Sequence, residues 1–143
     1  MKTLIIMFIA IILVPSLSAQ VTEIPAEKKS AVVDNLTEGI KSDNSGLQTS
    51  SALVMYDLIN ESYLKSSDAS KAMIPLLKML DNGKTEEERI AAAVALYQLG
   101  NSIGIYRLNG VARFDDNERV ASVCRNLYYS YHKLNGTEYL TRL

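Results

Sequence analysis

The chain contains one histidine, His132, and one cysteine, Cys124. A single histidine excludes most zinc sites and the catalytic triads that are built on histidine. His132 falls on the outer side of the last expected helix, so we expect a solvated residue. Cys124 shares a helical face with Val120 and Leu127, which predicts an inert thiol packed in the core. A bridge between two copies and a reactive thiol are the alternatives.

The densest group of carboxylates is the run of three glutamates at residues 86–88. Consecutive helical residues point in different directions around the axis, so these side chains do not converge on a metal or a substrate. They suit a helix N-terminus, where Thr85 and Glu88 match a capping box and the helix dipole favours negative charge. Asp115 and Glu118 repeat the pattern. With no phosphate loop, paired cysteines or nucleophile elbow in the sequence, we expect no catalytic, cofactor-binding or metal-binding residues.

The elements that would position these residues are all predicted to be helices. In residues 72–99, Met73, Leu76, Leu77 and Leu80 have the spacing of one buried helical face, and a second helix follows the cap at Thr85. The second helix is apolar on two sides and therefore needs neighbours beyond its hairpin partner. Further helices are expected over residues 26–41, 47–62, 102–114 and 115–133. The first and the last are apolar on one side only, which is typical of the ends of a stacked array.

One hairpin carries a recognisable order of residues: Ile74-Pro75, Leu77, Leu80-Asp81, and then Arg89 leading into an alanine-rich run. This order resembles a HEAT repeat. The resemblance implies an all-α fold, a short right-handed α-solenoid of about three HEAT-like helical hairpins. It also implies structural roles: Pro75 bends its helix, and Asp81 and Arg89 form hydrogen bonds between repeats, with Arg119 at the matching position of the third hairpin.

The repeats are imperfect. Setting Gln48, Arg89 and Arg119 in register gives offsets of 41 and 30 residues, against a HEAT period of about 40 to 47. The first repeat has neither the proline nor the arginine of the second. A compact bundle of five or six helices is the alternative architecture.

The N-terminal residues have the three parts of a secretory signal peptide. A short positive region is followed by an apolar run at residues 4–14 and a small-residue exit that ends at Ala19. The apolar run is too short to span a membrane, which takes about 20 residues. We expect a signal peptide at residues 1–19, a linker at 20–25, a helical repeat domain at 26–134 and a flexible tail at 135–143. The mature chain would then be periplasmic or secreted.

Charge excludes some classes of partner. Lys2 is lost with the signal peptide, so 14 of the 15 Lys and Arg residues remain against 16 Asp and Glu, without a cluster of one sign. Such a balance argues against binding to nucleic acid or anionic lipid. We expect a monomer that binds another protein or a peptide segment.

In HEAT-like solenoids the second helix of each hairpin lines the concave side, so the resemblance implies a partner-binding row there. Its members are Asp57, Glu61, Ala95, Gln98, Arg125, Tyr128, Tyr129 and His132. The predicted function is a non-catalytic, cofactor-free adaptor or scaffold of the bacterial envelope or the extracellular space. One alternative is a HEAT-like lyase or small-ligand-handling protein, which needs a polar pocket. The other is a structural subunit that self-associates through its tyrosine-rich end.

Overall fold

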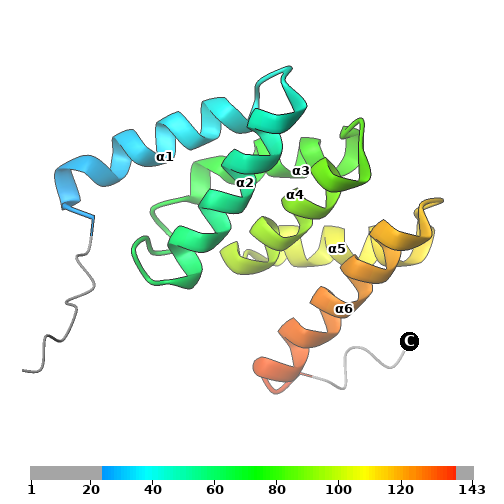
Figure 1. The fold of residues 1–143 in the computed structure, drawn as a ribbon. Helices are drawn as coiled ribbons and strands as arrows, with labels where there is room; N and C mark the ends of the chain where they lie inside the picture. Colours follow the sequence, from blue (N-terminus) through cyan, green and yellow to red (C-terminus); the bar gives the residue numbers. More distant parts are fainter. Residues whose placement is uncertain (1–23, 138–143) are drawn as a thin grey trace, which may run out of the picture.

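A computed structural model describes residues 24–137, and every regular element in that range is helical (Figure 1). The predicted all-α class is therefore confirmed. The expected signal peptide at residues 1–19, most of the expected linker and the end of the expected tail lie outside the described residues. None of the described helices is long and apolar enough to cross a membrane. The elements are α1 (Ala26–Ile40), α2 (Ser45–Asn60), the 3-10 turn η1 (Ser70–Ala72), α3 (Met73–Asn82), α4 (Glu86–Leu99), α5 (Ser102–Phe114) and α6 (Glu118–Leu134).

Helix α4 is the centre of the arrangement. It packs against α2 on one side and α6 on the other, and it also contacts α3 and α5. In Figure 1 α2, α4 and α6 lie side by side, with α3 and α5 behind them. Its alanines are buried, and such small side chains let neighbouring helices approach closely. The expectation that this helix is covered on more than one side is confirmed.

One contiguous core runs through all three hairpins. The long connection between α2 and α3 also contributes to it, because Leu64 is buried and its backbone N–H donates to the carbonyl of Leu58 at 2.9 Å. Residues 102–114 form one continuous helix although Gly104 and Gly110 are poor helix formers. Gly104 is tolerated for a packing reason: a Cβ there would lie 3.3 Å from a methyl carbon of Leu96.

Both ends of α4 are formed by residues that favour a helix terminus. The amide of Glu88 donates to the Thr85 hydroxyl at 3.2 Å, and the Glu88 carboxylate accepts from the Thr85 amide at 3.4 Å, so the predicted capping box is present. Gly100 ends the helix with a φ of 63°, in the left-handed region that glycine adopts most readily. Its N–H donates to the carbonyl of Leu96 at 3.2 Å.

The prediction of a second capping box, formed by Asp115 and Glu118, is wrong. Helix α6 is capped by Asn117, whose side-chain oxygen accepts from the amide of Val120 at 3.0 Å. Asp115 instead ends α5, and its carboxylate is engaged by Arg89. The helix begins two residues later than the predicted box requires, and the Asp115 carboxylate accepts from the amide of the cap residue Asn117 at 3.0 Å, not from an amide of the first turn. Glu118 is left exposed at the start of the helix.

Two leucines on the helices are exposed to solvent. Leu53 lies on the side of α2 that neither α1 nor α4 covers, and Leu134 lies in the last turn of α6, beyond the packed part of the molecule. The described part of the expected tail is ordered by hydrogen bonds. Gly136 has a φ of 66°, and the amide of Thr137 donates to the carbonyl of His132 at 2.9 Å.

Candidate binding sites

The predicted row across α2, α4 and α6 is only partly on the surface. Asp57 on α2 and Glu61, the residue that caps the C-terminus of α2, are exposed. Ala95 and His132 are buried, so the expectation that they face solvent is wrong. On α4, Ala95 faces the packed interior, and its neighbour Val94 is the partly exposed residue. The row therefore has no continuous surface from one hairpin to the next.

The remaining members of the row make contacts within the protein. A guanidinium nitrogen of Arg125 donates to the carbonyl of Ala112 at 3.1 Å, which satisfies the C-terminal end of α5. Gln98 is half-buried, and its backbone carbonyl accepts from the Ser66 hydroxyl at 3.3 Å. Tyr129 is exposed. Arg125 thus has a structural role that explains its position without a partner.

His132 lies in a small aromatic cluster at the end of α6. Its ring centroid is 4.5 Å from that of Tyr128 and 5.5 Å from that of Tyr131, both in edge-to-face geometry. Its Nδ1 lies 2.7 Å from the hydroxyl of Thr137. The Tyr131 hydroxyl donates to the carbonyl of Gly100 at 3.3 Å. Tyr131 therefore holds α6 against the junction of α4 and α5.

Two of the residues assigned to repeat contacts form ion pairs between the second and third hairpins. Asp81 on α3 accepts from the Nε of Arg107 on α5 at 2.7 Å. Arg119 on α6 donates to Glu86 on α4 at 3.3 Å. Both pairs are largely exposed, and each contributes little to stability on its own.

Arg89 makes the most extensive of these contacts. Its Nε donates to the carbonyl of Leu80 at 2.8 Å, and its two terminal nitrogens engage both oxygens of Asp115, one of them at 3.0 Å. Both side chains are mostly buried. The Arg89 guanidinium holds the pKa of Asp115 below its usual value, and Asp115 in turn raises the pKa of Arg89. This fork joins α3, α4 and the α5–α6 turn.

Cys124 is buried, as predicted, and desolvation raises the pKa of its thiol to about 12. A thiol with so high a pKa carries almost no nucleophilic thiolate at neutral pH. Residues 24–137 contain no group of three or more His, Cys, Asp or Glu side chains that could hold a metal ion.

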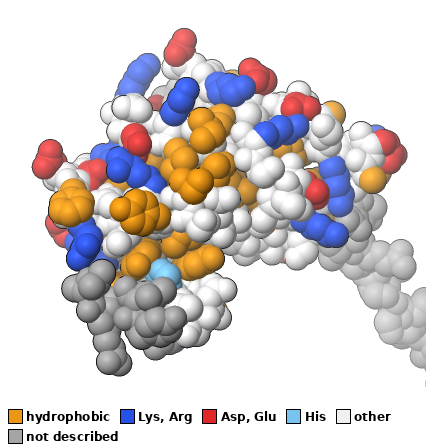
Figure 2. Space-filling view, turned by 180° about the vertical axis from the view of Figure 1, so that it is seen from behind, with side chains coloured by type: hydrophobic (Ala, Val, Ile, Leu, Met, Phe, Trp, Pro, Cys, Tyr) orange, Lys and Arg blue, Asp and Glu red, His pale blue; other side chains and the backbone are white. Residues whose placement is uncertain are grey.

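The outward face of α5 carries apolar residues that sequence reasoning missed. Ile103 is 56% exposed, Tyr106 78% and Phe114 81%. The sequence signal is their spacing, because positions 103, 106, 110 and 114 fall on one side of a helix. Arg107 and Arg113 are exposed on the same helix. Figure 2, which views the molecule from behind Figure 1, shows several hydrophobic side chains on the side of α3 and α5, with basic and acidic groups between them.

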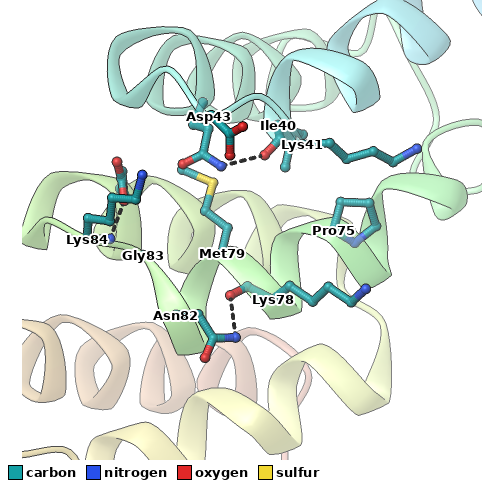
Figure 3. Close-up of a pocket in the computed structure, with 11 residues that line it drawn as sticks. Ile40, Lys41, Asp43, Pro75, Lys78, Met79, Asn82, Gly83 and Lys84 are labelled. Atoms are coloured by element: carbon teal, nitrogen blue, oxygen red, sulfur yellow. Dashed lines mark hydrogen bonds between the residues drawn. The ribbon is translucent and has the colours of Figure 1, made fainter.

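A polar pocket of about 350 Å³ lies between the α1–α2 turn and the α3–α4 turn (Figure 3). Pro75 lines it from the first turn of α3, where its missing N–H breaks no helical hydrogen bond. This pocket could not be predicted from the sequence, because its walls come from residues about 40 positions apart. The other lining residues are Ile40, Lys41, Asp43, Gln48, Lys78, Met79, Asn82, Gly83, Lys84 and Glu88.

Comparison with known proteins returned no match to a family model, to a curated protein or to a solved structure.

Proposed function

We propose that this protein is an exported, non-catalytic adaptor of the bacterial envelope or extracellular space, and that it binds another protein through the outward face of α5. The observation that carries the proposal is the exposure of Ile103, Tyr106 and Phe114 on one side of that helix. Large exposed apolar groups that share a face mark an interaction surface more often than scattered single residues do. This location replaces the row inferred from the sequence, which is interrupted at Ala95 and His132.

The chemistry of the α5 face fits a protein partner. Covering an aromatic side chain removes about 150–250 Å² of surface from water, at about 25 cal/mol per Å², so Tyr106 and Phe114 could together contribute several kcal/mol. Tyrosine and arginine are enriched among residues that dominate binding energy. Exposed Arg113 favours a partner whose contact surface combines apolar and acidic side chains.

The scaffold that we propose for this face is a short right-handed array of HEAT-like hairpins. The side-by-side packing of α2, α4 and α6 supports it, and so do the polar contacts made by Asp81, Arg89 and Arg119 between the second and third hairpins. In such an array the last hairpin has a neighbour on one side only. Helix α5 belongs to that last hairpin, which accounts for its uncovered face.

Export is inferred from the signal-like pattern of residues 1–19. If it is correct, protein recovered from the producing cell begins at Gln20, which N-terminal sequencing measures directly. A chain that retains Met1 and stays in the cytoplasm would contradict the proposed location.

The binding proposal is tested by affinity capture from envelope extract with the wild type and two matched double variants. Tyr106→Ser with Phe114→Ser removes two exposed apolar groups from α5, and Leu53→Ser with Val54→Ser removes two from α2. We expect the first variant to lose a partner that the wild type and the second variant retain. Equal capture by all three would contradict the α5 site. A concentration series in light scattering separates a foreign partner from a second copy of the chain.

A further inference from the structure

Three asparagines of the sequence are followed directly by glycine: Asn82, Asn109 and Asn135. In an Asn-Gly pair the asparagine side chain loses ammonia most readily, because glycine has no side chain to hinder attack by its own backbone nitrogen. The reaction also needs open space and a backbone that can rotate. The fold therefore decides which of the three pairs can react.

The pairs at Asn82 and Asn109 are held in place by their surroundings. The amide of Gly83 donates to the carbonyl of Met79 at 2.9 Å, and a Cβ added at Gly83 would lie 2.7 Å from the same oxygen. Asn109 and Gly110 lie in the interior of α5, and both are half-buried. Moving either glycine nitrogen onto its asparagine side chain requires helical hydrogen bonds to open.

The pair at Asn135 is much less restrained. It follows the last residue of α6, and both Asn135 and Gly136 are exposed. A Cβ added at Gly136 would meet nothing within 4 Å. Figure 1 shows the last turn of α6 extending past the ends of the neighbouring helices. This pair therefore has the space that the reaction needs.

Two hydrogen bonds must still break before Asn135 can react. The amide of Gly136 donates to the carbonyl of Lys133 at 3.3 Å, and the side-chain amide of Asn135 donates to the carbonyl of Tyr131 at 2.7 Å. Both bonds belong to the terminal turn of the helix. Helix ends fray at little cost, whereas opening a helix interior costs much more.

We propose that Asn135 is a site of spontaneous deamidation in the folded protein, and that the fold protects Asn82 and Asn109. The backbone nitrogen of Gly136 bonds to Cγ of Asn135, and the Cγ–Nδ2 bond breaks. Ammonia leaves with Nδ2, its two hydrogens and the proton from the Gly136 nitrogen. Water then opens the cyclic imide at either carbonyl, which gives aspartate or isoaspartate.

The products would disturb the end of α6. A carboxylate at residue 135 lies at the C-terminus of the helix, where the helix dipole disfavours negative charge. Isoaspartate also adds a methylene group to the main chain before Gly136. The amide of Thr137 donates to the carbonyl of His132 at 2.9 Å, and the longer main chain would break this bond. The site is separate from the α5 face, so it stands independently of the adaptor function.

The sequence provides a matched comparison. Asn109 and Asn135 are both preceded by leucine and followed by glycine, so their local chemistry is the same. Trypsin cleaves after lysine and arginine, which places the three pairs on separate peptides at residues 79–84, 108–113 and 134–142. Deamidation adds one dalton to a peptide, so mass spectrometry follows all three sites in one sample.

The test is incubation of the folded protein in mildly alkaline buffer, with an unincubated digest as the background. We expect the 134–142 peptide to convert at least about tenfold faster than the other two, because only its pair lies at a frayed helix end. In guanidinium chloride the 108–113 and 134–142 peptides should convert at similar rates. Hydrogen exchange at the Thr137 amide should be faster in the isoaspartate product than in the unmodified protein.

Two glycine variants separate the chemistry from the stability of the fold. Gly136→Ala should largely abolish conversion of Asn135, because the methyl group hinders the attacking nitrogen. Gly110→Ala is the matched control and should leave that conversion unchanged. The proposal is overturned if the 108–113 or 79–84 peptide converts as fast as 134–142 in the folded protein. It is also overturned if Asn135 reacts only after unfolding, or if Gly136→Ala converts like the wild type.

Discussion

Arg89 and Asp115 illustrate how much depends on single side chains in this small protein. Their fork is mostly buried and joins α4 to the turn before α6, and the same carboxylate accepts from the Asn117 amide at 3.0 Å. Breaking a buried pair by removing one partner commonly costs about 3 kcal/mol, because the other charge is left uncompensated. We therefore assign this pair a larger structural role than the exposed pairs around it.

Stability should depend on pH through the carboxylates of Asp115 and Glu88. Both have lowered pKa values in the folded protein. Above the unfolded-state values of about 3.9 and 4.3, both groups are ionised in either state and their contribution is complete. As the pH falls below about 4, the unfolded chain binds protons first, so the free energy of unfolding decreases until the folded pKa values are reached.

Urea titrations between pH 7 and pH 2 measure this dependence. Asp115→Asn should be less stable than the wild type at pH 7 and should lose less stability on acidification. A variant with the same acid dependence as the wild type would show that the Arg89 contact does not set the behaviour of this carboxylate.

The thiol of Cys124 should be unreactive in the native protein. Burial raises the pKa of its thiol to about 12, so neither the thiolate nor access for a reagent is available. We expect iodoacetamide at pH 7.5 to label it only after the protein is unfolded, and mass spectrometry to find no intermolecular disulfide. Rapid labelling without denaturant would place the thiol at a surface and revive the reactive-cysteine alternative.

At the scale of the elements, helix positions were more predictable than helix faces. The spacing of apolar residues depends on local geometry, so it placed the helices within a few residues of their observed ends. Which side of a helix is covered depends on neighbours far along the chain. Ala95 was misplaced for this reason, since α4 packs against both α2 and α6.

The start of α6 provides a test of the revised cap. Asn117→Ala removes the acceptor for the Val120 amide, and it should reduce the free energy of unfolding by about 1 kcal/mol. Glu118→Gln changes the exposed residue of the box that the sequence suggested, and it should have little effect. Chemical denaturation of both variants gives the comparison. The reverse order of effects would restore the cap predicted from Asp115 and Glu118.

For the molecule as a whole, the sequence indicated the fold class but not the site. A hairpin pattern repeated with imperfect spacing was enough to predict helices packed around a central one. The α5 face was not predicted because Gly104 and Gly110 are poor helix formers that interrupt its apolar residues. The Glu88 pocket was missed since its two walls meet only after α2 packs on α4. Surfaces made by packing cannot be read from the periodicity of either partner alone.

Arg125 and Tyr128 are unsuitable positions for testing a partner-binding surface. Both residues belong to the predicted row. Replacing them removes the hydrogen bond to the Ala112 carbonyl and part of the ring packing on His132. Loss of a partner in that variant would report on the stability of the last hairpin rather than on a binding row. The exposed aromatic residues of α5 give a cleaner test of function.

The most direct measurement is site-specific photo-crosslinking in the producing cell, with a photoreactive phenylalanine in place of Tyr106, Phe114 or Val54. All three positions are exposed, so each can accept the larger side chain. We predict that positions 106 and 114 crosslink to the same protein and that position 54 does not. Crosslinks to that protein from position 54 alone, or no crosslink from either α5 position, would contradict the assignment of the α5 face as the partner-binding surface.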